Sequence, residues 1–186
     1  CIREESTQSI LRLETGQGQS YPVKDGIPDL TFPNPLPASD NNTRQFYDLR
    51  SETYDQYLPL TFKTHHEDEQ KIRNSLIDGL SLTQGDRILE IGCGTGRDSE
   101  IIARRLGVEG ELYLQDISAL MLKKCRLRLE NVELKKEFCV ANAVYLPFPD
   151  NFFDATYSFG SLGEYSDIRR SLAEMDRVTK TGGKIL

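Results

Sequence analysis

A glycine-rich turn directly after a short apolar run constrains the fold of this chain more than any other feature. The run Ile88-Leu89-Glu90-Ile91 leads into Gly92-Cys93-Gly94-Thr95-Gly96, and a helical stretch follows. Glycine lets the backbone adopt positive φ and approach a ligand closely, and the helix that follows presents unpaired N–H groups. In a doubly wound sheet such a turn lies at the carboxyl edge of the strands, where ligands bind. We therefore expect a ligand site at this turn.

Short apolar runs alternate with helical stretches from residue 86 onwards. In chain order, the expected strands and helices occupy residues 87–91, 99–106, 111–114, 120–129, 137–140, 153–159, 168–178 and 184–186. Alternation of this kind predicts an α/β fold in which helices cover both faces of a doubly wound, mostly parallel sheet.

Composition and charge narrow the class of protein. The chain has 186 residues, of which 38% are hydrophobic, so a soluble globular domain with a real core is expected. The net charge of −6 argues against a nucleic-acid partner, whose phosphates are bound mainly by Lys and Arg. No run approaches the ~20 apolar residues of a membrane span, so we expect no membrane association and a cytoplasmic protein. The four cysteines form no C-x-x-C pair, and we predict no metal site.

Prolines and turn formers divide the chain. Five of the eight prolines fall between Pro22 and Pro37, which places a boundary near residue 40. The expected units are a small β appendage over residues 1–40, helices over residues 41–85, and the sheet-forming core over residues 86–186. In the appendage, strands at residues 10–13 and 21–23 flank a turn at Gly16 and Gly18.

Two amphipathic helices are expected between the appendage and the core. The spacing of apolar residues predicts them at residues 43–58 and 67–80, separated by Pro59. Burial of Phe46 and Tyr54 against the sheet is the plain structural interpretation of the first helix.

A carboxylate follows the second expected strand. Asp116 comes about twenty residues after the glycine turn, at the tip of the neighbouring strand, where it can accept both hydroxyls of a ribose. The alternative is an ordinary N-cap for a helix that starts near Ser118. The glycine spacing is G-x-G-x-G, and Arg97 stands where a dinucleotide fingerprint would have its third glycine. That departure disfavours a nicotinamide cofactor.

Four motifs in order resemble the class I S-adenosylmethionine-dependent methyltransferases of the type 11-like group. They are the glycine turn at 90–96, the acidic loop at 116–121, the stretch ANAVYLPFPDNFFD at 141–154 and RVTKTGGK at 177–184. The resemblance implies a Rossmann-like methyltransferase fold with S-adenosylmethionine as the cofactor. It also implies that further strands follow the fifth strand in the family, so we expect a fragment from which the C-terminal strands are missing.

The resemblance also implies which residues hold the cofactor. The glycine turn would line its methionine part, Asp116 would hold the ribose hydroxyls, and Ile117 and Met121 would flank the adenine. Asn142 stands where the family often has an aspartate that accepts from the adenine amino group, and an amide oxygen can still accept. The stretches Phe46-Tyr47-Asp48 and Tyr54-Asp55-Gln56-Tyr57 are similar to one that precedes the core in this family and folds over the cofactor, so the helices over residues 41–85 are expected to form a lid. The implied cofactor-binding residues are Tyr54, Glu90, Gly92, Cys93, Gly94, Gly96, Asp116, Ile117, Met121, Asn142, Ala143 and Phe159.

Other residues that could carry chemistry have plainer interpretations. Phe159, Glu164 and Tyr165 follow the fourth expected strand, where they either contact ligands or merely pack. Cys93 lacks a nearby histidine, which argues against a nucleophile. The adjacent His65 and His66 fit an exposed turn better than a catalytic base. No catalytic residue is identified.

The first forty residues carry a second resemblance. The stretch YPVKDGIPDL at residues 21–30 is similar to the end of a small zinc-ribbon module that often precedes methyltransferase domains. Glu14 and Gln17 occupy the expected cysteine positions and Cys1 alone remains, which is too few thiolates for a zinc site. We expect a degenerate ribbon held by packing.

Three functions fit these observations unequally. The first is methyl transfer from S-adenosylmethionine to a small-molecule acceptor that the sequence does not identify. The second is a non-catalytic regulatory or scaffolding subunit that binds the cofactor. A nicotinamide-dependent oxidoreductase is the third and least favoured. An uncovered edge of the sheet would also favour a homodimer.

Overall fold

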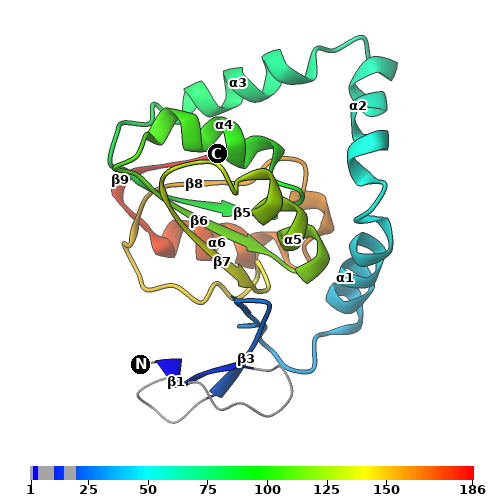
Figure 1. The fold of residues 1–186 in the computed structure, drawn as a ribbon, viewed down its shortest axis with the longest axis vertical. Coiled ribbons are helices and arrows are strands. Elements are labelled where there is room, and N and C mark those ends of the chain that lie inside the picture. The colour runs from blue at the N-terminus through cyan, green and yellow to red at the C-terminus, as the bar shows by residue number, and fades with distance from the viewer. Residues whose placement is uncertain (1, 4–10, 15–19) are drawn as a thin grey trace.

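A five-stranded parallel sheet forms the centre of the molecule (Figure 1). The computed structural model describes residues 2–3, 11–14 and 20–186. The sheet has the order β7-β6-β5-β8-β9, which confirms the doubly wound prediction. The strand order reverses between β5 and β8, the place where such sheets bind ligands. The strands are β5 (Arg87–Ile91), β6 (Glu111–Asp116), β7 (Lys135–Val140), β8 (Phe153–Tyr157) and β9 (Thr179–Ile185).

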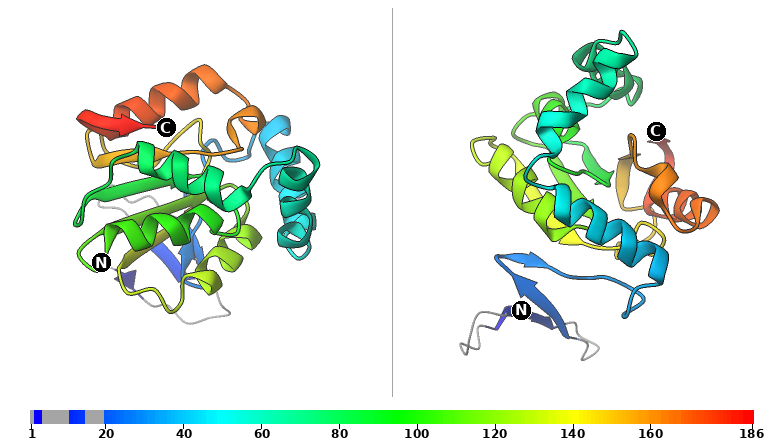
Figure 2. Two further views of the ribbon diagram at one scale, coloured as in Figure 1. Left: turned by 90° about the horizontal axis from the view of Figure 1, so that it is seen from above. Right: turned by 90° about the vertical axis from the view of Figure 1, so that its right-hand side faces the viewer.

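Helices cover both faces of this sheet (Figure 2). Helices α4 (Arg97–Leu106) and α5 (Ala119–Arg128) lie on one face and α6 (Ile168–Val178) lies on the other. Alternate side chains of β5 therefore enter different cores: Ile88 joins the cluster on the α4 and α5 side, and Leu89 packs with Met175 of α6. Because both faces of β5 are covered, its residues from Ile88 to Ile91 are all buried rather than alternately buried and exposed.

The small antiparallel sheet near the N-terminus consists of β1 (Ile2–Arg3), β2 (Leu11–Glu14), β3 (Ser20–Lys24) and β4 (Ile27–Pro28). Its second and third strands confirm the expected pair, whereas the predicted turn glycines, Gly16 and Gly18, and Cys1 lie outside the described residues. After β4 the chain runs parallel to β7, and Leu30 N donates to Val140 O at 2.8 Å. This isolated bridge joins the appendage to β7, an edge strand of the large sheet.

Three helices connect the appendage to the sheet: α1 (Ala38–Arg50), α2 (Tyr54–Thr64) and α3 (Glu69–Gly79). The prediction of one helix over residues 43–58 is wrong, because the chain leaves the helix at residues 51–53. The hydroxyls of Ser51 and Thr53 donate to backbone carbonyls three residues earlier, which favours a turn there.

Pro59 does not separate two helices as predicted; it lies inside α2. An interior proline cannot donate the backbone hydrogen bond to the carbonyl four residues earlier. No residue of α2 is fully buried, so water can reach that carbonyl and the helix continues.

The plain structural interpretation of the first helix, in which Phe46 is buried against the sheet, is also wrong. The Phe46 side chain is 45% exposed, and Leu49 on the same helix is 83% exposed. The opposite face of α1 points inward instead. No helix of the described ranges is both long enough and apolar enough to cross a membrane.

Candidate functional site

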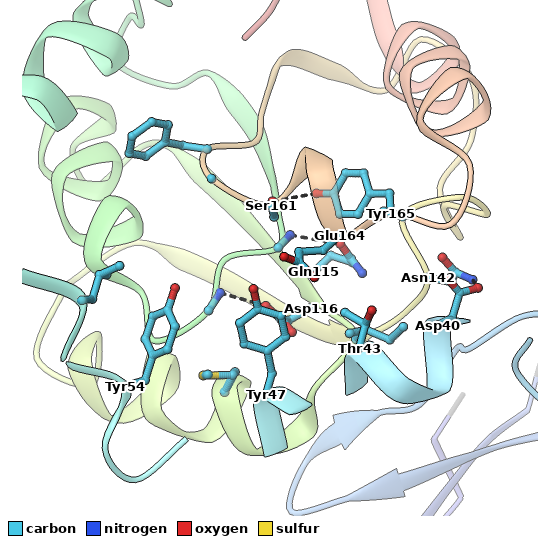
Figure 3. A pocket seen from close by; sticks show the side chains of 18 of the residues that line it. Asp40, Thr43, Tyr47, Tyr54, Gln115, Asp116, Asn142, Ser161, Glu164 and Tyr165 are labelled. Carbon is cyan, nitrogen blue, oxygen red and sulfur yellow. Dashed lines mark hydrogen bonds between the residues drawn. The ribbon is translucent and has the colours of Figure 1, made fainter. Parts of the chain in front are cut away.

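A pocket lies at the carboxyl ends of β5 and β6, with α1 and α2 along one side (Figure 3). Its empty volume is about 1090 Å³, including the open space at its mouth. Most of the predicted cofactor-binding residues line it: Tyr54, Gly92, Gly94, Asp116, Ile117, Met121, Asn142, Ala143 and Phe159. The other three, Glu90, Cys93 and Gly96, are buried behind this lining.

The sequence predicted that the N-terminal helices contribute Tyr54, but it did not identify the other residues that they bring to the pocket. Asp40, Thr43 and Tyr47 of α1 line the pocket, as do Leu58 and Phe62 of α2. The three α1 residues are spaced i, i+3 and i+7, so they share one helix face. The spacing alone predicts that these three residues share a face, but the apolar character of Phe46 indicated burial of a different face.

Glycines at left-handed φ shape the turn between β5 and α4. The φ angles are 69° at Gly92, 53° at Gly94 and 84° at Gly96. A Cβ at Gly96 would lie 2.7 Å from Cys125 Sγ, and one at Gly92 would lie 2.6 Å from Ser161 Oγ. A Cβ at Gly94 would meet no atom within 4 Å. Gly94 therefore borders open space, whereas its two neighbours border packed protein.

Asp116 connects this turn to the loop after β6. Its Oδ2 accepts from Gly94 N at 2.8 Å, and its Oδ1 accepts from Ser118 N at 2.8 Å. The alternative role of helix N-cap belongs to Ser118, whose side chain accepts from Met121 N. Burial raises the pKa of Asp116 to about 6, although these backbone N–H groups oppose the rise. A carboxylate that lines the pocket is thus poised to accept hydrogen bonds.

Glu90 lies beneath the turn and is 3% exposed. Ser99 Oγ lies 2.5 Å from its Oε2. Burial, together with the nearby charge of Asp98, holds the pKa of Glu90 well above its usual range. The neutral carboxyl is therefore a structural group behind the glycine turn.

We expect Glu90→Gln to fold and to gain stability relative to the wild type as the pH rises. The unfolded wild type ionises above its ordinary pKa while the folded protein stays protonated, so the wild type loses stability with rising pH and the amide does not. Urea unfolding of both proteins between pH 4.5 and 8 measures the difference. A Glu90→Gln protein much less stable than the wild type at pH 7 would show instead that the ionised carboxylate is required.

Cys93 is 6% exposed, and burial raises the pKa of its thiol well above the usual value. A buried, protonated thiol is a poor nucleophile. Cys93→Ala and Cys93→Ser are therefore expected to keep cofactor affinity and any transfer activity, as measured by titration calorimetry and a labelled-methyl assay. Loss of transfer with binding intact would make Cys93 a nucleophile after all.

A cluster of hydroxyls holds the loop after β8 against the glycine turn. Tyr165 OH lies 2.8 Å from Ser158 Oγ and 2.9 Å from Ser161 Oγ. Tyr165 OH also donates to Ile91 O at 3.3 Å, and burial raises the pKa of Tyr165 to about 12. Tyr165 is therefore a protonated anchor. Together with Phe159 and Glu164, it lines the pocket.

Two tyrosines form the wall on the side of the N-terminal helices. The rings of Tyr47 and Tyr54 meet edge to face with centroids 6.1 Å apart. Burial raises the pKa of both, so neither ionises near neutral pH. Asp48 fixes α1 by accepting from Ser118 Oγ at 2.5 Å, and Asp55 fixes α2 by accepting from Thr95 Oγ1 at 2.6 Å.

Arginines near the pocket are already paired. Arg73 lines it, yet its guanidinium donates to Asp98 at 2.6 Å and to Glu69 at 2.9 Å. Arg97 donates twice to Glu69, at 2.6 and 2.7 Å, and so ties α4 to α3. Arg97 thus has a structural role where a dinucleotide site would have glycine.

The side chain of Asn142 is fixed by two partners. Its Oδ1 accepts from Val144 N at 3.0 Å, and its Nδ2 donates to Asp40 Oδ2 at 2.8 Å. Asn142 and Asp40 are 2% and 4% exposed, respectively. This pair joins the segment after β7 to α1.

The histidines lie outside the pocket. His65 and His66 are exposed in the turn after α2, as predicted, and His65 Nδ1 lies 2.7 Å from Thr61 O. Over the described ranges, no three His, Cys, Asp or Glu side chains gather as a metal-binding group.

Comparison with known proteins supports the fold and the family. Residues 89–186 match the family described as methyltransferase domain. The chain is 41% identical over 103 residues to the ubiquinone/menaquinone biosynthesis C-methyltransferase UbiE of Cupriavidus necator, covering 55% of this chain and 42% of that protein. The corresponding protein of Stenotrophomonas maltophilia is 45% identical over 103 residues, covering 54% of this chain and 40% of its own length. The chain thus spans less than half the length of these relatives.

Solved structures agree on the architecture. A chain from the Haloferax volcanii complex of the Trm112 methyltransferase activator with a methyltransferase has a TM-score of 0.61 at 19% identity, covering 75% of this chain and 57% of that chain. The YcgJ protein of Bacillus subtilis has a TM-score of 0.58 at 24% identity, covering 63% and 49%. These structures share the Rossmann-like methyltransferase fold. With a family match over more than half of its residues, this chain belongs to the methyltransferase domain family.

Proposed function

We propose that this chain binds S-adenosylmethionine and serves methyl transfer from it to a small-molecule acceptor. One observation carries the proposal: the open face of Gly94 and the buried carboxylate of Asp116 border the same pocket and are joined by a 2.8 Å hydrogen bond. The curated relatives are C-methyltransferases of quinone biosynthesis, which supports a small-molecule acceptor methylated at carbon.

The pocket residues fit an adenosyl cofactor. Asp116 offers a carboxylate for the ribose hydroxyls, and Gly94 leaves room for a ligand beside the backbone. Ile117 and Met121 offer apolar surface for a base. The sulfonium of the cofactor supplies an already activated methyl group. The chain therefore has to bind, orient and exclude water rather than provide a nucleophile.

The remaining surface suits a largely apolar acceptor. Leu58, Phe62 and Phe159 line the pocket, and the aromatic faces of Tyr47 and Tyr54 can stabilise a nearby cation. Arg73 is paired with two carboxylates, so it does not offer an anion site. Both tyrosines stay protonated, and we assign no general base.

The alternative is a regulatory or scaffolding subunit that binds the cofactor without turnover. Two departures from the family pattern motivate it: Asn142 in place of the usual aspartate, and the degenerate zinc ribbon. A nicotinamide cofactor remains the least favoured, since Arg97 is committed to Glu69.

Calorimetry followed by a transfer assay separates these functions. S-adenosylhomocysteine and S-adenosylmethionine should bind with one site per chain, and labelled methyl should then pass to a compound in a metabolite extract. The extract should include quinone precursors, and Gly94→Val protein is the matched negative control. Binding without transfer by the longest available form of the protein would favour the scaffold. Tighter binding of NAD would overturn both.

Three further expectations stay proposals. We propose that residues 1–40 are a degenerate zinc ribbon without bound metal, that the protein is cytoplasmic, and that it forms a homodimer along the edge strand β9. Metal analysis, fractionation and light scattering test them in turn.

A further inference from the structure

We propose that Asp40 of α1, oriented by Asn142, reads the base of the cofactor by accepting a hydrogen bond from its exocyclic amino group. This inference rests on the proposed cofactor. It assigns base recognition to α1, a helix that precedes the sheet-forming core.

Two hydrogen bonds fix the orientation of the Asn142 amide. Val144 N is a donor, so it fixes the Asn142 oxygen on its own side at 3.0 Å. The amide nitrogen must then point to Asp40, which it reaches at 2.8 Å. The donor side of Asn142 is thereby used by Asp40, and its acceptor side is used by the backbone.

The carboxylate of Asp40 can accept further hydrogen bonds. A carboxylate offers about four acceptor sites. In the part of the chain that the structure describes, Asn142 is the one side chain that donates to Asp40. Asp40 nevertheless lines the pocket and is 4% exposed, so a ligand group that binds beside it meets an acceptor shielded from water.

The position of Asp40 in the pocket also suits a contact with the base. Asp40, Thr43 and Asn142 lie together at one side, with Asp116 between them and Tyr54 (Figure 3). Ala143, adjacent to Asn142 in the chain, lines the same pocket with Ile117 and Met121. A base that rests on these apolar side chains, with its ribose at Asp116, has its edge within reach of Asp40.

A carboxylate at this place discriminates between purines. An amino group on the base donates to it, whereas a carbonyl at the same ring position places two acceptors together in a buried site. Sites that leave a buried polar group unpaired reject the wrong ligand strongly. Adenine carries the amino group and hypoxanthine carries the carbonyl.

The test compares S-adenosylhomocysteine with S-inosylhomocysteine by titration calorimetry. The wild type should prefer the adenine compound by at least about tenfold. In Asp40→Asn, the new amide oxygen takes the hydrogen bond from Asn142 and the new amide NH₂ faces the base. The preference should therefore fall by at least about tenfold, to parity or beyond.

Glu52→Gln is the matched control, because it removes the same charge just after α1 from a side chain that is 78% exposed and lies outside the pocket lining. Its preference between the two compounds should equal that of the wild type. Circular dichroism confirms that each variant is folded. The wild-type measurement stands even if Asp40→Asn does not fold: equal binding of both compounds by the wild type would overturn the inference.

The outcomes also separate this inference from the function on which it rests. If the wild type binds neither compound, the proposed cofactor is wrong and Asp40 has no base to read. If both bind with the same preference in wild type and Asp40→Asn, the cofactor stands and Asp40 is not the reader.

Discussion

Gly94→Val is expected to abolish binding of S-adenosylhomocysteine while the protein stays folded. No atom of the protein lies within 4 Å of a Cβ at this position, so the added side chain would occupy space that the cofactor needs. The backbone at Gly94 has a φ of 53°, where a side chain costs ~1–2 kcal/mol, a tolerable fraction of the stability of a domain. Calorimetry measures the binding, and thermal unfolding measures the fold.

Gly96→Val provides the contrast at the same turn. A Cβ there would lie 2.7 Å from Cys125 Sγ and 3.1 Å from its Cα, so this variant should lose ~1–3 kcal/mol of unfolding free energy through overpacking in addition to its backbone strain. If a folded Gly94→Val protein bound the cofactor as tightly as the wild type, the glycine turn would not be part of the cofactor site.

Cofactor affinity is expected to fall about tenfold between pH 7 and pH 5, because Asp116 has a pKa near 6 in the free protein. Ribose hydroxyls donate to the ionised carboxylate, so binding favours the deprotonated form. Affinity is then full above the pKa and is lost as the pH falls through it. Titrations at pH 5, 6 and 7 measure the slope.

Asp116→Asn should weaken binding about ten- to hundred-fold at pH 7 and remove most of this pH dependence, since hydrogen bonds to a charged group contribute ~1.5–3 kcal/mol. Asparagine is the sharper test than alanine. Alanine would leave the N–H groups of both Gly94 and Ser118 without the acceptor that the carboxylate now provides, whereas the amide oxygen of asparagine still accepts from one of them. A folded Asp116→Asn protein with wild-type affinity would exclude the carboxylate from the site.

The core of the fold follows from local sequence. Strand β5 occupies the expected residues because Ile88, Leu89 and Ile91 provide apolar side chains for both faces of the sheet. The glycines after Ile91 end the strand. The expected start of β9 at residue 184 was too late. Thr179–Thr181 have little apolar character, so hydropathy did not reveal that the strand begins there.

The N-terminal helices could not be placed in the same way. Their pattern predicted helices, but the choice of buried face depends on tertiary contacts that the pattern does not contain. Asp40 is held inside by a hydrogen bond from Asn142, about a hundred positions later in the chain. Asp48 is likewise held inward by a hydrogen bond from Ser118. The consequence was that Phe46 was expected inside and Asp40 was overlooked.

The residues of the candidate site also differ in whether the sequence alone could reveal them. Glycines and Asp116 could be found because a ligand turn and a strand-end carboxylate have fixed places in a doubly wound sheet. Tyr54 was found by resemblance alone. Thr43, Tyr47 and Leu58 enter the pocket only because α1 and α2 pack over the sheet edge that carries it.

Titration calorimetry of S-adenosylhomocysteine into the wild-type protein at pH 7, with Asp116→Asn beside it, decides whether the pocket is a cofactor site. We expect one site per chain, affinity above that for NAD, and weaker binding by the variant. A folded wild-type protein that binds no S-adenosylhomocysteine, or that binds NAD more tightly, would contradict this expectation.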